Sequence, residues 1–222
     1  MNYLAIDCGS EFLSLALCYD SHVENIILKV GSHQTEFVLP EIEKLLKSNK
    51  LQLGDLNLIC YNQGPASFTG LRIGLSVALS IAYSLDIPML SVSSFHLYLA
   101  DYLNRHKTAL EQPIYIALDA RLSQVYLAHL DSNGNVLTTQ AISPEQISCC
   151  DDGVLLTNAQ DIYSGDWQQQ FSQIINVNEY PSASNMFYWV DKLPTVNYAE
   201  ADLLYVRNKI ALNLEEQKLL KR

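Results

Sequence analysis

The segment from Ser67 to Leu85 constrains the fold more than any other part of the sequence. It contains one charged residue, Arg72, and it follows the turn-forming residues 64–66, Gly-Pro-Ala. Ser67 or Thr69 can cap a helix here, and the apolar spacing predicts a helix from Ser67 that ends before Asp86. A helix that is apolar around most of its girth must be buried. The chain therefore needs either a large core or a partner to cover this helix.

Small residues recur at every fourth position of this predicted helix: Gly70, Gly74, Ala78 and Ala82. The adjoining ridge is aliphatic: Leu71, Leu75 and Leu79. A ridge of small side chains lets a second element approach closely. Each glycine costs about 1 kcal/mol relative to alanine inside a helix, so close packing must offset that cost. The sequence leaves two interpretations open, a core helix of one lobe and a contact with another subunit.

Short apolar segments alternate with helical ones in the first half of the chain. We expect strands at 3–7, 13–19, 23–29, 58–62 and 89–92, and helices at 35–48, 67–85 and 94–104. Strands followed by helices in alternation indicate an α/β architecture.

The second half is predicted to be a smaller lobe of strands. We expect strands at 113–119, 124–130, 136–140 and 154–157, with a hairpin turn at Asn133-Gly134. This divides the chain into lobes 1–107 and 108–222. The segment 198–211 reads as a return segment that ends in a short helix, so the end of the chain is a candidate to pack back on the first lobe.

Acidic residues are unevenly distributed. The net charge of the chain is −10, and no Lys or Arg occurs between Leu122 and Asp191. Nucleic-acid affinity depends on Lys and Arg neutralising phosphates, so this chain alone is a poor RNA or DNA binder. The favoured interpretation is that the acidity keeps the protein in solution, and the alternative is an acidic docking face.

The sequence favours a cytoplasmic protein. It has no run of about 18 consecutive apolar residues, so we expect no membrane-spanning helix. Residues 1–7 contain no basic n-region, so we expect no secretory signal. Five cysteines, an odd number without zinc spacing, favour reduced thiols over a disulfide framework.

The turn after the first predicted strand is the candidate phosphate loop. Asp7, Gly9 and Ser10 combine a carboxylate at a strand end with a glycine turn. Backbone N–H groups in such a turn can hold a phosphate, and the carboxylate can hold hydrated magnesium. An ordinary hairpin turn explains the same residues. A further candidate is Asp119 with Arg121, which could form an ion pair at a strand end.

Several sequence segments together resemble the TsaB family of bacterial tRNA threonylcarbamoyladenosine biosynthesis. They are residues 4–10, 64–74, 92–94, 118–121 with Tyr126, and 205–207, and the run 67–74 is the most specific of them. The resemblance implies an actin/Hsp70/sugar-kinase-like fold of two related lobes with mixed sheets. One departure is Ala66, where the family usually has glycine.

The resemblance also implies a non-catalytic role. Family members pair with TsaD, the catalytic paralogue that transfers threonylcarbamoyl to N6 of adenosine 37 in tRNA, and a small ATPase, TsaE, joins them. Alone they form homodimers through the same surface, and they meet tRNA only through the complex. The metal-binding histidines of the paralogue correspond in position to Ser94 and Tyr98, which are poor metal ligands. We therefore expect a pseudoenzyme without a metal or a tightly bound cofactor, with ATP or ADP bound at most weakly or at the subunit interface.

We expect the partner interface on the helices at 35–48 and 67–85. Its predicted residues are Phe37, Leu45, Ser67, Phe68, Leu71, Arg72, Gly74, Leu75, Ala78, Leu79 and Ala82. A bulky residue at Gly74 should then abolish pairing and leave a folded monomer. The alternative functions are an ATP-binding enzyme of the actin/sugar-kinase superfamily and a metallopeptidase-like protein.

Overall fold

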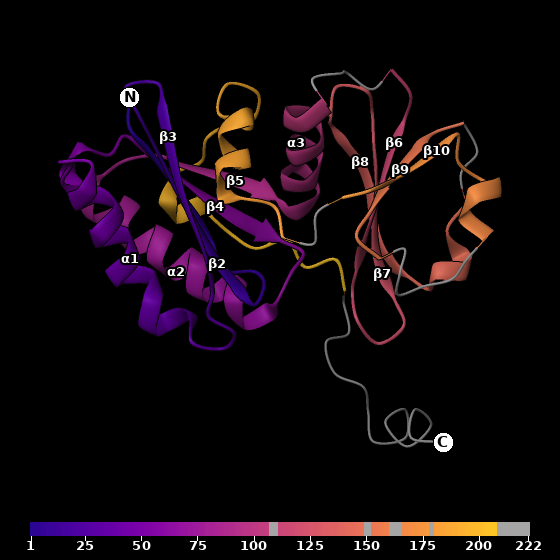
Figure 1. Ribbon diagram of the computed structural model, residues 1–222, viewed down its shortest axis with the longest axis horizontal. Coiled ribbons are helices and arrows are strands. Elements are labelled where there is room, and N and C mark those ends of the chain that lie inside the picture. The colour runs from indigo at the N-terminus through magenta and orange to yellow at the C-terminus, as the bar shows by residue number, and fades with distance from the viewer. Residues whose placement is uncertain (107–110, 149–151, 160–165, 178–179, 208–222) are drawn as a thin grey trace.

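The protein consists of two lobes that lie side by side, each built on a five-stranded mixed sheet (Figure 1). The computed structural model describes residues 1–106, 111–148, 152–159, 166–177 and 180–207. The expected lobe boundary, residues 107 and 108, lies outside these ranges, as does the end of the expected C-terminal helix.

The first sheet has the strand order β3-β2-β1-β4-β5. Its strands are β1 (Tyr3–Asp7), β2 (Phe12–Tyr19), β3 (His22–Lys29), β4 (Leu58–Gly64) and β5 (Met89–Ser93). β1, β2 and β3 form an antiparallel meander, whereas β4 and β5 are added in parallel to β1. The carboxyl ends of β1, β4 and β5 therefore meet at one edge of the sheet.

Side-chain alternation along the strands separates two cores. Leu4 and Ile6 of β1 face one core, and Ala5 between them faces the other. The first core is covered by α1 (Gln34–Ser48) and α2 (Phe68–Leu85). The short 3-10 helix η1 (Leu53–Asp55) precedes β4. The second core is covered by α3 (Ser94–His106) and the 3-10 helix η4 (Ala183–Trp189).

The second sheet repeats the topology of the first. Its order is β10-β9-β6-β7-β8, from strands β6 (Ile114–Asp119), β7 (Val125–Leu130), β8 (Val136–Ile142), β9 (Val154–Thr157) and β10 (Gln173–Asn176). Again an antiparallel meander is followed by two strands added in parallel. The 3-10 helices η2 (Pro144–Gln146) and η3 (Asp166–Gln169) lie in the positions of α1 and α2. The expectation of two related lobes is confirmed, and β10 is a strand that the sequence analysis missed.

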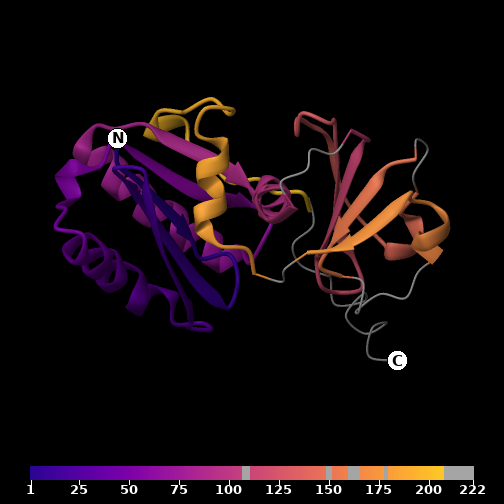
Figure 2. The ribbon, with the colours of Figure 1, turned by 45° about the horizontal axis from the view of Figure 1, so that its top comes forward.

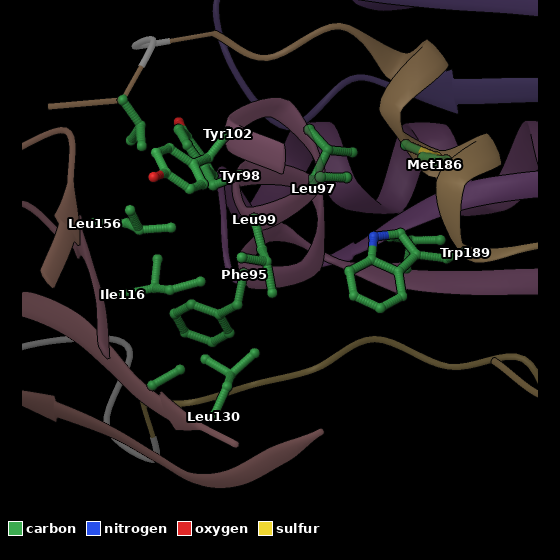
Figure 3. Packing of buried hydrophobic residues seen from close by; sticks show 14 of the residues in the cluster. Phe95, Leu97, Tyr98, Leu99, Tyr102, Ile116, Leu130, Leu156, Met186 and Trp189 are labelled. Atoms are coloured by element: carbon green, nitrogen blue, oxygen red, sulfur yellow. The ribbon is translucent and has the colours of Figure 1, made fainter. Parts of the chain in front are cut away.

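Helix α3 lies between the two lobes. Its residues from Ser94 to Tyr102 are all buried, which covers every side of the helix. Figure 3 shows rings and leucines of α3 packed toward Ile116, Leu130 and Leu156 of the second sheet. Side chains from both lobes therefore belong to one continuous hydrophobic core.

The chain returns to the first lobe after β10. η4 packs against α3 and against β1 and β2, and Figure 2 shows this segment lying along the first lobe. Val196 then forms a bridge with Met89 at the outer edge of β5. The segment continues through η5 (Tyr198–Glu200) to Arg207 without further helix. Within the described residues, the expected return segment is present and its helical part is limited to η5.

By length and composition alone, α2 could cross a membrane. Its 18 residues have a mean hydropathy of 1.4, and 33% of that window is buried. The lack of an uninterrupted apolar run in the sequence therefore does not exclude a helix whose length and composition would allow it to span a membrane. The contacts of α2 with β1, β4 and β5 account for its buried third, and its other residues are partly or fully exposed.

The small-residue ridge of α2 packs against its own lobe. An alanine Cβ at Gly70 would lie 1.9 Å from the carbonyl oxygen of Cys8, and one at Gly74 would lie 3.7 Å from the Cys8 Cβ. Ala78 and Ala82 have no exposed surface. The expectation that this ridge contacts a partner is therefore corrected, because the turn after β1 and the sheet beneath it already cover these residues.

The two glycines of α2 are predicted to respond differently to alanine. Gly70→Ala forces the helix away from the Cys8 carbonyl and should lower the free energy of unfolding by about 2–4 kcal/mol. Gly74→Ala makes only ordinary contacts and should be neutral or stabilising by up to about 1 kcal/mol. Urea unfolding measures both, with Gly54→Ala as the control because its Cβ meets nothing within 4 Å. Equal destabilisation by all three variants would contradict this packing.

Candidate functional site

A cleft of about 850 Å³ lies between the two lobes. From the first lobe it is lined by the turns that follow β1 and β4 and by the start of α3. From the second lobe it is lined by the β6–β7 turn, and the C-terminal segment 204–207 also lines it. Ligand sites of open α/β sheets commonly occupy this position, beyond the carboxyl ends of parallel strands.

A hydrogen-bond network joins three chain segments at the cleft. Asp7 Oδ1 accepts hydrogen bonds from the Gly9 backbone N–H, at 2.8 Å, and from Asn62 Nδ2, at 3.0 Å. Asn62 Oδ1 in turn accepts the Gly64 N–H at 2.8 Å and the Ser94 hydroxyl at 3.1 Å. The network exists because β1, β4 and β5 end at the same edge of the sheet. Asp7 and Gly9 were expected at this site from the sequence, whereas no sequence pattern indicates Asn62.

The turn at Gly9 is closed by the β4–α2 turn. The Ser67 N–H donates to the Gly9 carbonyl oxygen at 2.9 Å. A Cβ at Gly9 would lie 2.8 Å from the Ala66 Cβ and 3.0 Å from Asp7 Oδ1. The Ala66 methyl group therefore fills the space above Gly9, which is the structural consequence of alanine at this position.

The third residue of the candidate phosphate loop also has internal partners. Ser10 Oγ accepts the Phe12 N–H at 3.0 Å, and the Ser10 carbonyl oxygen accepts a hydrogen bond from Gln34 Nε2 at 3.0 Å. The structure therefore brings Asp7, Gly9 and Ser10 together at the cleft, as predicted. The Gly9 N–H already donates to Asp7, so a phosphate would have to compete with that bond.

Burial raises the pKa of Asp7 above its ordinary value. The hydrogen bonds from Gly9 and Asn62 oppose this shift but do not cancel it. Burial likewise raises the pKa of the Cys8 and Cys60 thiols, so neither has the lowered pKa of a reactive cysteine.

Ser94 and Tyr98 both line the cleft, one turn apart on α3. The Tyr98 hydroxyl accepts a hydrogen bond from Asn158 Nδ2 at 3.1 Å, across the two lobes. Within the described ranges, no three His, Cys, Asp or Glu side chains are grouped closely enough to hold a metal.

The lone buried histidine of α3 is a structural residue. His96 Nδ1 lies 3.0 Å from Ser93 Oγ, and His96 Nε2 lies 3.0 Å from the Gly134 carbonyl oxygen. The carbonyl can only accept, so Nε2 carries the proton. Burial lowers the pKa of His96, which favours this neutral form. The histidine thus connects α3 to the β7–β8 turn of the second lobe.

On the opposite side of the cleft, Asp119 shapes the β6–β7 turn. Its Oδ1 accepts the backbone N–H of Arg121 at 2.8 Å. Arg207 reaches the same turn from the C-terminal segment and donates to the Ala120 carbonyl oxygen at 3.1 Å. Arg207 lies in the segment 205–207, which resembles the TsaB family, but nothing else in the sequence indicates that it contacts the β6–β7 turn.

The outer face of α1 and α2 is a second candidate site. Phe37, Leu39 and Tyr83 are exposed by 40%, 57% and 69% of their surface. The exposed ridge of α2 is Arg72, Ser76, Ser80 and Ser84. Small residues again recur at every fourth position, but this ridge faces outward.

The structure divides the predicted interface residues into three groups. Those exposed are Phe37, Ser67, Phe68 and Arg72, and those partly buried are Leu75 and Leu79. Those buried within the first lobe are Leu45, Leu71, Gly74, Ala78 and Ala82. The buried group packs within the first lobe and offers little surface to a partner.

Several relatives of this chain bear the same name. A protein named tRNA threonylcarbamoyladenosine biosynthesis protein TsaB from Escherichia coli (strain K12) is 35% identical over 60% of this chain, and the match spans 58% of that relative. The TsaB of Bacillus subtilis (strain 168) is 34% identical over 68% of this chain and 64% of its own length. The TsaB of Haemophilus influenzae (strain Rd) is 24% identical over 95% of both chains.

Two solved structures from Pseudomonas aeruginosa have the same fold. YeaZ superposes with a TM-score of 0.75, at 21% identity, over 92% of this chain and 100% of its own. A protein described as similar to peptidase YeaZ gives a TM-score of 0.77, at 19% identity, over 93% and 99%. With the duplicated sheets and the interlobe cleft, they define a protein of the actin/sugar-kinase-like class. A model of the TsaD family, tRNA N6-adenosine threonylcarbamoyltransferase, matches residues 29–217. The chain belongs to this family, among its TsaB members.

Asp7→Asn is predicted to stabilise the protein at neutral pH. A carboxyl whose pKa is raised on folding contributes stability below its unfolded pKa, and this contribution is lost as the pH rises through the folded pKa. A carboxamide oxygen accepts the same two hydrogen bonds without carrying the buried charge. We expect a gain of roughly 1 kcal/mol at pH 7 that shrinks as the pH falls toward 4. Thermal unfolding between pH 4 and 8 measures it, with the exposed Asp20→Asn as control; equal effects of the two variants would contradict it.

The isolated chain is predicted to show no saturable binding of magnesium-ATP below about 1 mM in calorimetry. The reason is that the Gly9 amide already donates to Asp7 and the Ala66 methyl group closes the turn. Micromolar binding by the unaltered chain would contradict the prediction and favour an ATP-binding enzyme.

Proposed function

We propose that this chain is a non-catalytic subunit in tRNA threonylcarbamoyladenosine biosynthesis, and that it pairs with a TsaD-like transferase through the outer face of α1 and α2. A TsaE-like ATPase joins the pair, and tRNA is contacted through the complex. In the absence of the partner, the same face pairs two copies of this chain. The proposed location is the cytoplasm, where tRNA is modified, and the chain needs no cofactor of its own.

The observation that carries the proposal is the exposed serine ridge of α2. Ser80 Oγ donates to the Ser76 carbonyl oxygen at 2.8 Å, and Ser84 Oγ donates to the Ile81 carbonyl oxygen at 2.9 Å. These hydroxyls therefore stay hydrogen bonded when another helix covers them, and their small size permits close approach. Buried polar groups without partners would otherwise weaken such an interface.

Exposed apolar side chains also lie on the two helices that form this face. Phe37 and Leu39 extend from α1, and Tyr83 extends from the last turn of α2, where its ring packs edge-on against Tyr198. Exposed aromatic residues near the centre of a surface are typical of binding hot spots. The net charge of −10 further favours contact through this neutral face over direct contact with tRNA.

The internal bonding of the cleft supports an accessory role. A phosphate loop must offer free N–H groups to its ligand, whereas the Gly9 N–H donates to Asp7 within the turn. Ser94 and Tyr98, which correspond to the metal-binding histidines of the paralogue, have hydrogen-bond partners in the protein.

The direct test is threonylcarbamoyl transfer to tRNA by the TsaD-like protein, with the TsaE-like ATPase and the adenylate-forming enzyme, in the presence and absence of this chain. We expect transfer to require this chain, and we expect this chain without the paralogue to be inactive. Equal transfer in its absence would contradict the proposal.

Ser80→Trp is predicted to block pairing without unfolding the protein. Ser80 is exposed in the isolated chain, so the indole stays in solvent there, but it occupies the space that a partner helix needs. We expect at least a tenfold loss of affinity for the TsaD-like protein and a monomer in sedimentation, with an unchanged Tm. Ser132→Trp, in the exposed β7–β8 turn, is the matched control. Normal pairing by the Ser80 variant would place the interface elsewhere.

A further inference from the structure

The C-terminal segment from Asp202 to Arg207 is anchored on the first lobe at its beginning. The Tyr61 hydroxyl donates to the Asp202 carbonyl oxygen at 2.8 Å. Gln63 contributes two bonds, from its Nε2 to Asp202 Oδ1 at 3.1 Å and from the Leu204 N–H to its carbonyl oxygen at 2.9 Å. Both anchors lie on β4, so this part of the segment is fixed to the central sheet of the first lobe.

The middle of the segment is held by the start of α2. The Arg72 guanidinium lies over the Phe68 ring, 3.4 Å from its centroid, and donates to the Tyr205 hydroxyl at 3.2 Å. The Phe68 and Tyr205 rings are 6.0 Å apart. Arg72 thereby fixes the direction in which the chain leaves the first lobe.

The end of the segment binds the second lobe. Arg207 Nη2 donates to the Ala120 carbonyl oxygen at 3.1 Å and to Gln124 Oε1 at 2.7 Å. Its guanidinium also lies 5.8 Å from the Tyr126 ring. Within six residues, the chain thus connects β4 of the first lobe to the β6–β7 turn of the second.

The backbone conformation of the β6–β7 turn depends on contacts with residues outside the turn. Arg121, Leu122 and Ser123 have φ values of 58°, 51° and 55°, the left-handed region that favours glycine. Three consecutive side-chain-bearing residues in this region persist only when surrounding contacts hold them. Within the turn, the Ala120 N–H donates to the Gln124 carbonyl oxygen at 3.0 Å, so Arg207 binds both residues that close it.

We propose that residues 202–207 are a clasp that fixes the opening of the interlobe cleft and holds the β6–β7 turn in its left-handed conformation. The clasp lines the cleft that it spans, together with residues of that turn. Opening the cleft requires that either the Arg207 contacts or the β4 anchors break. This inference concerns the two lobes of one chain and does not depend on the partner proposed above.

The test is amide hydrogen exchange of the full chain, measured at Ala120 and Gln124. Arg207→Met keeps the length of the side chain and removes its hydrogen bonds. We expect exchange at these two amides to accelerate at least tenfold, while Ala5 in the centre of β1 keeps its rate and reports an intact fold. Lys192→Met is the matched control, because it removes one charge from an exposed side chain that touches Tyr188 and not the turn.

A second variant tests whether the anchors on β4 affect the β6–β7 turn at the other end of the segment. Tyr61→Phe/Gln63→Ala removes two bonds to the segment on the first lobe and alters no residue of the β6–β7 turn. We expect a severalfold acceleration at Ala120 and Gln124. If this variant leaves their exchange unchanged, Arg207 is only a local support of the turn and the clasp is refuted. Equal exchange in Arg207→Met and Lys192→Met refutes it as well.

Discussion

The structure depends on the burial of α3 between the two sheets. One side of this helix completes the core of the first lobe, and the other side meets side chains of the second sheet (Figure 3). Each sheet would otherwise expose an apolar face to water, at a cost of about 25 cal/mol for every Å². The same helix begins with Ser94 and carries Tyr98, so the packing that joins the lobes also places two polar groups at the cleft.

The cleft and the helix face both have polar groups bonded within the protein, but the helix face also exposes apolar side chains. At the cleft, a carboxylate, a glycine amide and an asparagine bond to each other at the ends of parallel strands. On α2, apolar side chains and small hydroxyl residues remain exposed, and the Ser80 and Ser84 hydroxyls bond to the helix's own backbone. The bonds at the cleft disfavour a small polar ligand, because the ligand would have to break them in order to bind. On the α2 face, a protein surface can cover the bonded hydroxyls without the loss of a hydrogen bond. This difference is the physical basis for proposing a partner surface over a catalytic cleft.

Sequence patterns predicted most of the elements because each has a clear period. The strand Tyr3–Asp7 and the strand Val154–Thr157 are found within the predicted bounds, since apolar runs between turns are unambiguous. β10 was missed because its residues Gln173–Asn176 are polar at both ends and only partly buried between them. For α2, the spacing of apolar and small residues predicted a helix with a small-residue ridge. It did not predict that the turn after β1 packs against this ridge. The close contact between Gly70 and the Cys8 carbonyl joins residues far apart in the sequence, and no local pattern encodes it.

The sequence by itself determined the alternation of strands and helices, the need to bury the helix after Ser67, and the position of Asp7, Gly9 and Ser10 at a strand end. These follow from hydrophobic period and turn chemistry, which act over a few residues. Only the tertiary structure decided which face of α2 is free, that Asn62 and Ala66 close the phosphate-like turn, and that Arg207 joins the two lobes. Each of these depends on a contact between segments that are distant in the sequence, and such contacts leave no periodic signal in it.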